Sequence, residues 1–345
     1  MPDILNLISD ADRLEFSQNI SVSRPAYIGD RIFPDQKTQN LKAEYLRLAE
    51  GANIPVMATV HAFDTEAEIG TRPVFDKTEV EKLLIKRKIN QTERVRLLTE
   101  NGVYADDAIV RYVFDDMRQM ADAVKVRTEV AKMEVLATGK MTIKENNLNM
   151  TVDYGVPTKN TGFKIDFGPD ADIIGQIMAV ADAAAESGNA LTEIVTSTKI
   201  LRKLAANKGI QTLIYGTVGA GTYVPAERIR SLFAELFGFG VITTNDLRYK
   251  TQTASGNEAT KRFFPEDKMA FLSNGTASSF GVGLWGVTPE EADYGQYNDK
   301  SMDQFITITQ WATPDPVAVW TKASGVFIPV VPNPTGLFIA ADTSK

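Results

Sequence analysis

The chain has 345 residues, of which 43% are hydrophobic and 23% charged, values typical of a soluble protein with core material for about two or three domains. The net charge of −7 argues against a nucleic-acid-binding surface as the main function, and the absence of cysteine excludes disulfides, thiolate metal sites and cysteine nucleophiles. With one histidine, no signal peptide and no apolar run of about 18 residues, any metal site needs carboxylate ligands and no membrane span is expected.

Residues 1–90 contain few apolar residues from which a core could form. Residues 1–50 alternate short apolar pieces with turns, and 39–50 has a modest helical pattern. We therefore expect an N-terminal arm that lies on another part of the structure. Residues 52–89 predict strand, turn and strand, with acidic and basic residues in near balance. Such a hairpin is marginal on its own and needs a neighbour in this or another chain, unless it is a solvated edge hairpin.

The chain is organised around residues 104–139, which contain no proline and no glycine before Gly139. Apolar or small side chains recur at spacings of three, four and seven, at Ile109, Val113, Met117, Met120, Val124, Ala131 and Val135. This period predicts one helix of roughly 50 Å with a single apolar stripe, ended by Gly139. Most charged residues fall elsewhere, so the pairs Asp106–Asp107 and Asp115–Asp116 are expected on a solvated face. A coiled-coil arm or bundle helix is the alternative to a helix lying on something extended.

Residues 140–154 alternate apolar and polar positions around a turn, which predicts a half-buried hairpin. Beyond it, helices are predicted over 171–186, 199–207 and 225–237, and strands over 193–196, 213–215, 241–243, 247–250 and 269–272, with a polar loop over 251–261. This block indicates an α/β domain with one mixed sheet. Further strands are predicted over 305–310, 317–320, 326–331 and 337–339, where prolines indicate edge strands or strand ends.

No stretch predicts catalysis. Residues 216–221 resemble a dinucleotide-binding turn, but Val224 stands where the third glycine would fall and no helix start follows directly. Residues 281–286 lack the Lys-Ser or Lys-Thr pair of a phosphate loop. His61 lies in an apolar strand without a serine or aspartate partner suggested by a motif. Adjacent carboxylates on a helix point apart and do not converge on a metal ion. Since none of these patterns is complete, we expect no metal, no cofactor and no enzymatic activity.

Three motifs occur in an order that resembles a known family. They are EVLATGKMT at 134–142, FFPEDKMAFLSNG at 263–275 and VFIPVVPNP at 326–334. Together with the order of segments, they are similar to the lambda major head protein family of tailed-phage major capsid proteins. The resemblance covers most of residues 40–340. It implies an α+β chain with the Hong Kong 97 fold.

The family's architecture implies four parts. Residues 1–50 would be the N-terminal arm, and 51–90 the extended loop that reaches over a neighbouring subunit. Residues 91–169 and 311–345 would form the peripheral domain with its long spine helix, and 170–310 the axial domain. Since the chain begins with Met1, we expect that no N-terminal scaffolding segment has been removed.

The resemblance also implies a function. The chain would assemble with itself, as hexamers and pentamers, into an icosahedral shell that encloses double-stranded DNA without sequence-specific binding. A portal protein and a decoration protein are the implied further partners, with no membrane. Assembly would take place in the host cytoplasm and the product would be the virion capsid. The charged loop should contact another subunit through Glu66, Glu68, Arg72 and Lys77. The alternatives are an encapsulin-type nanocompartment and, more distantly, a soluble α/β nucleotide-binding enzyme that uses the 216–221 turn.

Overall fold

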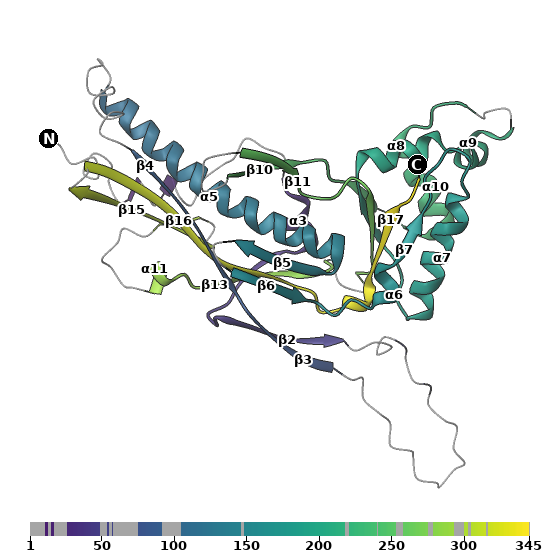
Figure 1. Ribbon diagram of the computed structural model, residues 1–345, viewed down its shortest axis with the longest axis horizontal. Helices are drawn as coiled ribbons and strands as arrows, with labels where there is room; N and C mark the ends of the chain where they lie inside the picture. Colours follow the sequence, from purple (N-terminus) through teal and green to yellow (C-terminus); the bar gives the residue numbers. More distant parts are fainter. Residues whose placement is uncertain are drawn as a thin grey trace, which may run out of the picture. The chain divides into compact units, whose positions relative to one another are not determined.

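A computed structural model shows an α+β chain (Figure 1). It describes residues 11–12, 15–16, 26–48, 54, 57, 75–91, 105–145, 148–217, 221–239, 241–252, 258–274, 279–292, 300–302, 305–314 and 317–344. The chain forms two compact units. The first comprises Met1–Ala43, Glu79–Ala131 and Val282–Pro329, and the second Glu44–Thr78, Lys132–Gly281 and Val330–Lys345. Among the described residues, no helix is both long and apolar enough to cross a bilayer.

The predicted long helix is confirmed as α5, Ala105–Thr138, which contributes residues to both units. Gly139 ends it in the left-handed conformation at φ +70°, and its N–H donates to the Val135 carbonyl at 2.7 Å. The members of the apolar stripe from Val113 to Val135 are buried. The expected solvated face is wrong in part, because Asp116, Glu129 and Lys132 are also buried. A helix covered on more than one side buries charges that periodicity alone assigns to solvent.

The first unit contains a six-stranded sheet built around β16. The sheet has the order β1-β13-β16-β15-β14, with β4 also paired to β16. Its strands are β1 (Asp35–Lys37), β4 (Leu83–Gln91), β13 (Val282–Gly286), β14 (Lys300–Met302), β15 (Ile306–Pro314) and β16 (Val317–Val330). The short helices of this unit are α3 (Ile28–Ile32) and α11 (Pro289–Ala292). The two runs expected as separate strands over 317–320 and 326–331 form one continuous strand of 14 residues.

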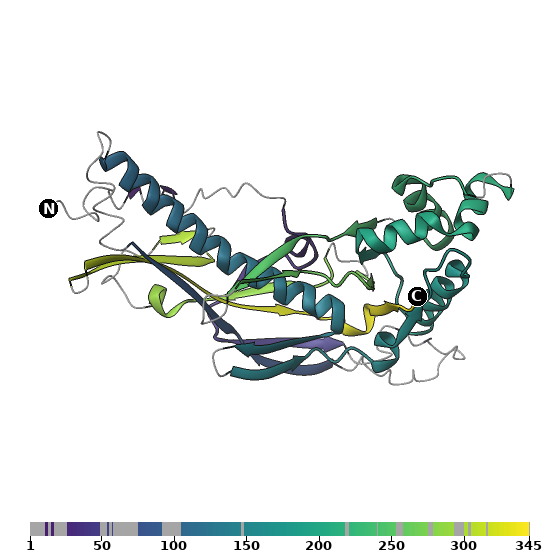
Figure 2. The ribbon, with the colours of Figure 1, turned by 45° about the horizontal axis from the view of Figure 1, so that its top comes forward.

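Helix α5 packs against one face of this sheet, as Figures 1 and 2 both show. Val319 and Ala323, at alternate positions of β16, are buried on that face together with Gly325. An added Cβ at Gly325 would lie 2.9 Å from Trp285 Cζ3 and 3.0 Å from Val124 Cγ1. Glycine at this position therefore allows the helix to approach the strand closely.

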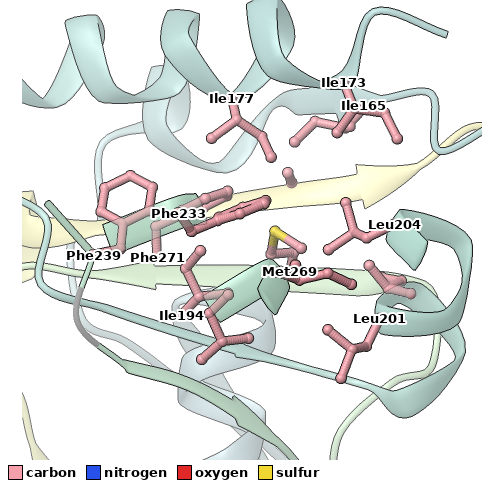
Figure 3. Packing of buried hydrophobic residues seen from close by; sticks show 14 of the residues in the cluster. Ile165, Ile173, Ile177, Ile194, Leu201, Leu204, Phe233, Phe239, Met269 and Phe271 are labelled. Atoms are coloured by element: carbon pink, nitrogen blue, oxygen red, sulfur yellow. The ribbon is translucent and has the colours of Figure 1, made fainter. Parts of the chain in front are cut away.

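The second unit has a five-stranded mixed sheet in the order β7-β17-β12-β8-β9. One mixed sheet was predicted for the middle of the chain, but the strand predicted over 247–250 lies in a separate two-stranded sheet, and β7 and the C-terminal β17 complete this one. Its strands are β7 (Phe163–Ile165), β8 (Glu193–Thr196), β9 (Val241–Thr244), β12 (Lys268–Leu272) and β17 (Leu337–Asp342). Its helices are α6 (Thr158–Thr161), α7 (Ile173–Glu186), α8 (Thr198–Ala206), α9 (Lys208–Tyr215) and α10 (Ala226–Phe237), with a short 3₁₀ turn over Pro334–Gly336. Figure 3 shows Ile177, Phe233, Met269 and Phe271 meeting in the core between helices and sheet.

One strand predicted in this unit is wrong. Residues 213–215 belong to helix α9, whose N-terminus is capped by Asn207 through a 3.1 Å hydrogen bond from Ile210 N–H. Ile210 is buried in the core and Ile214, one helical turn later, packs against it. An apolar run of three residues does not distinguish a strand from a helix. Here the packing of Ile210 and Ile214 against the core stabilises the helix.

Three two-stranded sheets complete the fold: β2 (Lys42–Leu48) with β3 (Phe75–Glu81), β5 (Lys140–Glu145) with β6 (Leu148–Asp153), and β10 (Arg248–Gln252) with β11 (Glu258–Arg262). The hairpin expected over 140–154 is confirmed. The helical pattern expected over 39–50 is wrong, because 42–48 is extended and pairs with β3. The polar loop expected over 251–261 is partly strand, since β11 begins at Glu258. Of the segment 52–89, predicted as strand, turn and strand, residues 52–74 lie outside the described residues, apart from residues 54 and 57.

Candidate intersubunit surface

Of the four residues predicted to contact another subunit, the structure describes Lys77. Glu66, Glu68 and Arg72 lie outside the described residues. The Lys77 ammonium lies 3.0 Å from the Glu44 carboxylate, so it pairs with β2 of the same chain. Both side chains are at least half exposed, and such pairs contribute about 0–1 kcal/mol. Part of the near balance of acidic and basic residues is therefore explained by ion pairs between the two strands of one hairpin.

The root of this hairpin, which is the point where β3 passes into β4, is built around a buried lysine. Lys82 lies between β3 and β4 and is 3% exposed. Its ammonium donates to Thr38 Oγ1, to the Asn40 carbonyl at 2.5 Å and to the Trp285 carbonyl at 3.2 Å. Burial lowers the pKa of Lys82 from its ordinary value. Lys82 was not among the residues predicted from the sequence. The one signal for it is register: Glu79 and Glu81 are exposed, Val80 is half-buried, and Lys82 is the next alternate position after Val80.

A buried carboxylate bridges two strands elsewhere in the first unit. Glu290 of α11 accepts hydrogen bonds from Lys322 on β16 at 2.7 Å and pairs with Lys86 on β4 at 3.2 Å. Burial raises the pKa of the Glu290 carboxyl, but the bonds from the two lysines outweigh it and leave that pKa below its ordinary value. The triad ties α11 to two strands that are paired at Lys322 and Lys88.

Cationic and aromatic side chains gather beside this triad. Trp311 and Trp320, opposite each other on β15 and β16, stack with ring centroids 6.2 Å apart and an interplanar angle of 10°. Lys88 Nζ lies 4.4 Å from the Trp320 ring centroid and Lys322 Nζ 5.6 Å from that of Trp311. This cluster is not visible in the sequence as a basic run interleaved with aromatics, because Lys88 lies on β4, far before the consecutive strands β15 and β16 that carry the two tryptophans and Lys322.

Part of the N-terminal segment lies on helix α5. The Phe16 ring lies against Phe114 with centroids 4.3 Å apart and a tilt of 34°, and the Arg118 guanidinium lies 5.7 Å from the Phe16 centroid. Gly29 N–H donates to the Glu129 carboxylate at 3.2 Å. These two contacts hold Phe16 and Gly29 against the helix, whereas residues 42–48 of the expected arm form β2 of the hairpin.

The glycine-rich stretches do not form phosphate cradles in the described part of the chain. Gly216 ends α9 at φ +75°, and Gly221 N–H donates to Gln211 Oε1 at 2.7 Å. Residues 282–286 form strand β13, whose backbone pairs with β1. His61 lies outside the described residues. Within the described ranges, no group of three or more histidine, aspartate or glutamate side chains is placed to hold a metal ion.

Solved structures share this fold over nearly the whole chain. The putative capsid protein of a prophage of E. coli CFT073 matches with a TM-score of 0.58 and 15% identity, covering 97% of this chain and 99% of that one. A phage-related protein from Bordetella bronchiseptica RB50 matches with a TM-score of 0.55 and 11% identity, covering 95% of both chains. The subunit of the mature capsid of bacteriophage PhiM1 matches with a TM-score of 0.50 and 9% identity, covering 94% of this chain and 90% of that one.

These likenesses define the class of protein as one with the Hong Kong 97 fold of phage capsid subunits. The family is shown separately by sequence: the profile of phage major capsid protein E matches residues 12–341, and the chain belongs to that family. No curated protein sequence matches the chain. The protein is therefore a structural, shell-forming protein of the virion capsid, and the resemblance found in the sequence is confirmed. Neither the nanocompartment nor the nucleotide-binding enzyme is favoured.

Proposed function

We propose that the chain forms hexamers and pentamers of an icosahedral shell around double-stranded DNA. We also propose that the extended loop, expected over 51–90, joins each subunit to its neighbour through its part before β4, since residues 83–91 form β4 and pair with β16 in the first unit. The observation that carries the second part is the weak internal support of this hairpin. Its described strands pair with each other as a two-stranded sheet, and the ion pairs between them are exposed: Lys77 with Glu44 at 3.0 Å and Lys42 with Glu79 at 3.5 Å. A two-stranded hairpin held in this way is marginal alone and gains stability from a second surface.

The division of labour in the proposed shell follows the family's architecture. Residues 1–50 act as the arm, 91–169 and 311–345 as the peripheral domain, and 170–310 as the axial domain that points to the five- and six-fold axes. Two strands cross these bounds: β17 pairs with β12 of the axial segment, and β13 lies in the sheet of β16. Contacts that are weak singly give a strong container when they are repeated over many copies. The net charge of −7 supports enclosure of DNA without adhesion to the wall.

Further partners and properties belong to the same proposal. A portal protein occupies one vertex and a decoration protein binds outside, assembly takes place in the host cytoplasm, and the protein has no enzymatic activity. Electron microscopy of the purified protein, with measurement of the nucleic acid inside particles made during infection, tests the shell and its content. A subunit that stays monomeric at high concentration while folded would refute the shell, and particles without DNA would refute the proposed content.

The contact residues have a test of their own. We expect Glu66→Lys, Glu68→Lys and Arg72→Glu together to lower the shell yield while the circular dichroism of the subunit stays unchanged, because the reversed charges face unchanged partners on the neighbour. Lys77→Glu should add to the defect. Normal shells from the triple variant would mean that these charges make no important contact between subunits.

A further inference from the structure

The hairpin that carries the proposed loop is the pair of β2 and β3. Its outgoing strand β2 begins at Lys42 and its returning strand β3 ends at Glu81, where the chain passes directly into β4 (Figure 1). The two passages are joined there by a backbone hydrogen bond from Lys82 N–H to the Leu41 carbonyl at 3.1 Å. At this root, the backbone hydrogen bond ties the outgoing segment to the returning one.

The side chain of Lys82 reinforces the same root. A lysine ammonium has three N–H donors, and here they are matched by three oxygens. Thr38 Oγ1 and the Asn40 carbonyl belong to the segment that leads into β2. The Trp285 carbonyl belongs to β13 and also accepts from Thr38 N–H at 2.9 Å. One side chain on the returning strand thus holds the outgoing segment and a strand of the six-stranded sheet together.

The surroundings leave room for this side chain in particular. An added Cβ at Gly286 would lie 3.1 Å from Lys82 Cδ and 2.9 Å from Val326 Cγ1, so glycine keeps open the path of the lysine stem. Among the described residues, the ammonium pairs with no carboxylate; its partners are neutral oxygens.

A buried cation without a counterion lowers stability, and an apolar side chain of similar volume would fill the space without that cost. What the ammonium adds is directional hydrogen bonding among three segments of chain. We propose that Lys82 is a positioning residue that clasps the root of the hairpin and sets the direction in which the loop over 51–74 leaves the subunit. The consequence for assembly rests on the proposed function of that loop.

The test uses Lys82→Met, an unbranched apolar side chain one heavy atom shorter than lysine, which fills most of the same space but has no donors. The chain contains no cysteine, so nitroxide labels can be attached at introduced cysteines, Lys77→Cys on β3 and Asn90→Cys on β4. Pulsed electron paramagnetic resonance on the unassembled subunit then measures the distance between the labels. We expect a narrow distribution with Lys82 and a broadened one with Lys82→Met, while the melting temperature is unchanged or higher.

Shell yield is measured on the unlabelled proteins. Here we expect Lys82→Met to lower the yield about tenfold, because a small loss in each contact is multiplied over many copies. Lys164→Met, which removes an exposed lysine from β7, is the matched control and should assemble normally. Thr38→Val removes one acceptor and leaves the lysine in place, and it should broaden the distribution to a smaller extent.

The two measurements distinguish the positioning role of Lys82, called the clasp here, from the proposed role of the loop in assembly. A narrow distance distribution in Lys82→Met would overturn the clasp, whatever the shell yield. A broadened distribution with normal shells would support the clasp and refute the proposed role of the loop in assembly. If Lys82→Met fails to fold, Thr38→Val decides the question, and an unchanged distribution in that variant would overturn the clasp.

Discussion

Replacing Met117 tests which face of helix α5 is buried. Met117 is fully buried in the first unit, and Val113, Met120 and Val124 of the same stripe are buried with it. An aspartate there would place an unpaired charge among apolar side chains, at a cost on the order of several kcal/mol. Since the whole stability of a domain is about 5–15 kcal/mol, we expect Met117→Asp to be insoluble or unfolded.

A milder substitution at the same position, Met117→Ala, allows the loss of stability to be measured. Truncation of a buried methionine removes apolar contacts and leaves a cavity, and costs about 2–5 kcal/mol. Gln119→Ala, at an exposed position two residues further along α5, is the control and should change the free energy of unfolding by about 0.5 kcal/mol or less. Urea unfolding of the dilute, unassembled subunit, followed by circular dichroism, measures both. Equal unfolding midpoints for the two alanine variants would refute the assignment of the buried face.

Other predictions concern acid, a glycine and salt. The folded pKa of Glu290 lies below the ordinary 4.5, so its stabilising contribution is present above that pH and is lost as pH falls through the folded pKa. Glu290→Gln should flatten the acid-dependent fall in melting temperature, and an unchanged slope would contradict this. Gly139→Ala should destabilise by about 1–2 kcal/mol from its left-handed backbone and further from a Cβ 2.8 Å from Val156 Cγ2. Gly238 is also left-handed, but an added Cβ there has no atom within 4 Å, so Gly238→Ala should lose only the backbone contribution. Equal losses of unfolding free energy in the two variants would show that the contact with Val156 contributes nothing. If charge attaches the loop over 51–90, shell yield should fall as salt rises, because screening acts over about 10 Å at 0.1 M salt.

The candidate intersubunit surface could be predicted only in outline. Charge balance singled out the segment around Lys77, and the structure pairs that lysine with Glu44 in the same chain. The partners of Lys82 could not be predicted, because they lie more than forty residues away and two of the three are backbone carbonyls. The Trp311–Trp320 stack joins two consecutive strands, but alternation along a strand does not give the register that places these rings opposite each other.

The sequence by itself determined the features with long, regular patterns. The stripe from Val113 to Val135 repeats over many turns of one helix, and Gly139 supplies the left-handed end, so helix α5 follows from local chemistry. The alternation over 140–154 is likewise sufficient for a hairpin. The order of three motifs was enough to indicate the family, because each motif reports a different part of the same fold.

Tertiary structure decided what short or ambiguous segments become. Residues 42–48 are extended because β3 is available to pair with them, and 213–215 are helical because Ile210 and Ile214 pack against the core on one side of α9. It also decided which charges are buried: Glu129 and Lys82 have hydrogen-bond partners that only the folded chain brings within reach. Segments of a few residues gain too little free energy from local propensity to choose a conformation, so long-range burial and pairing choose it for them.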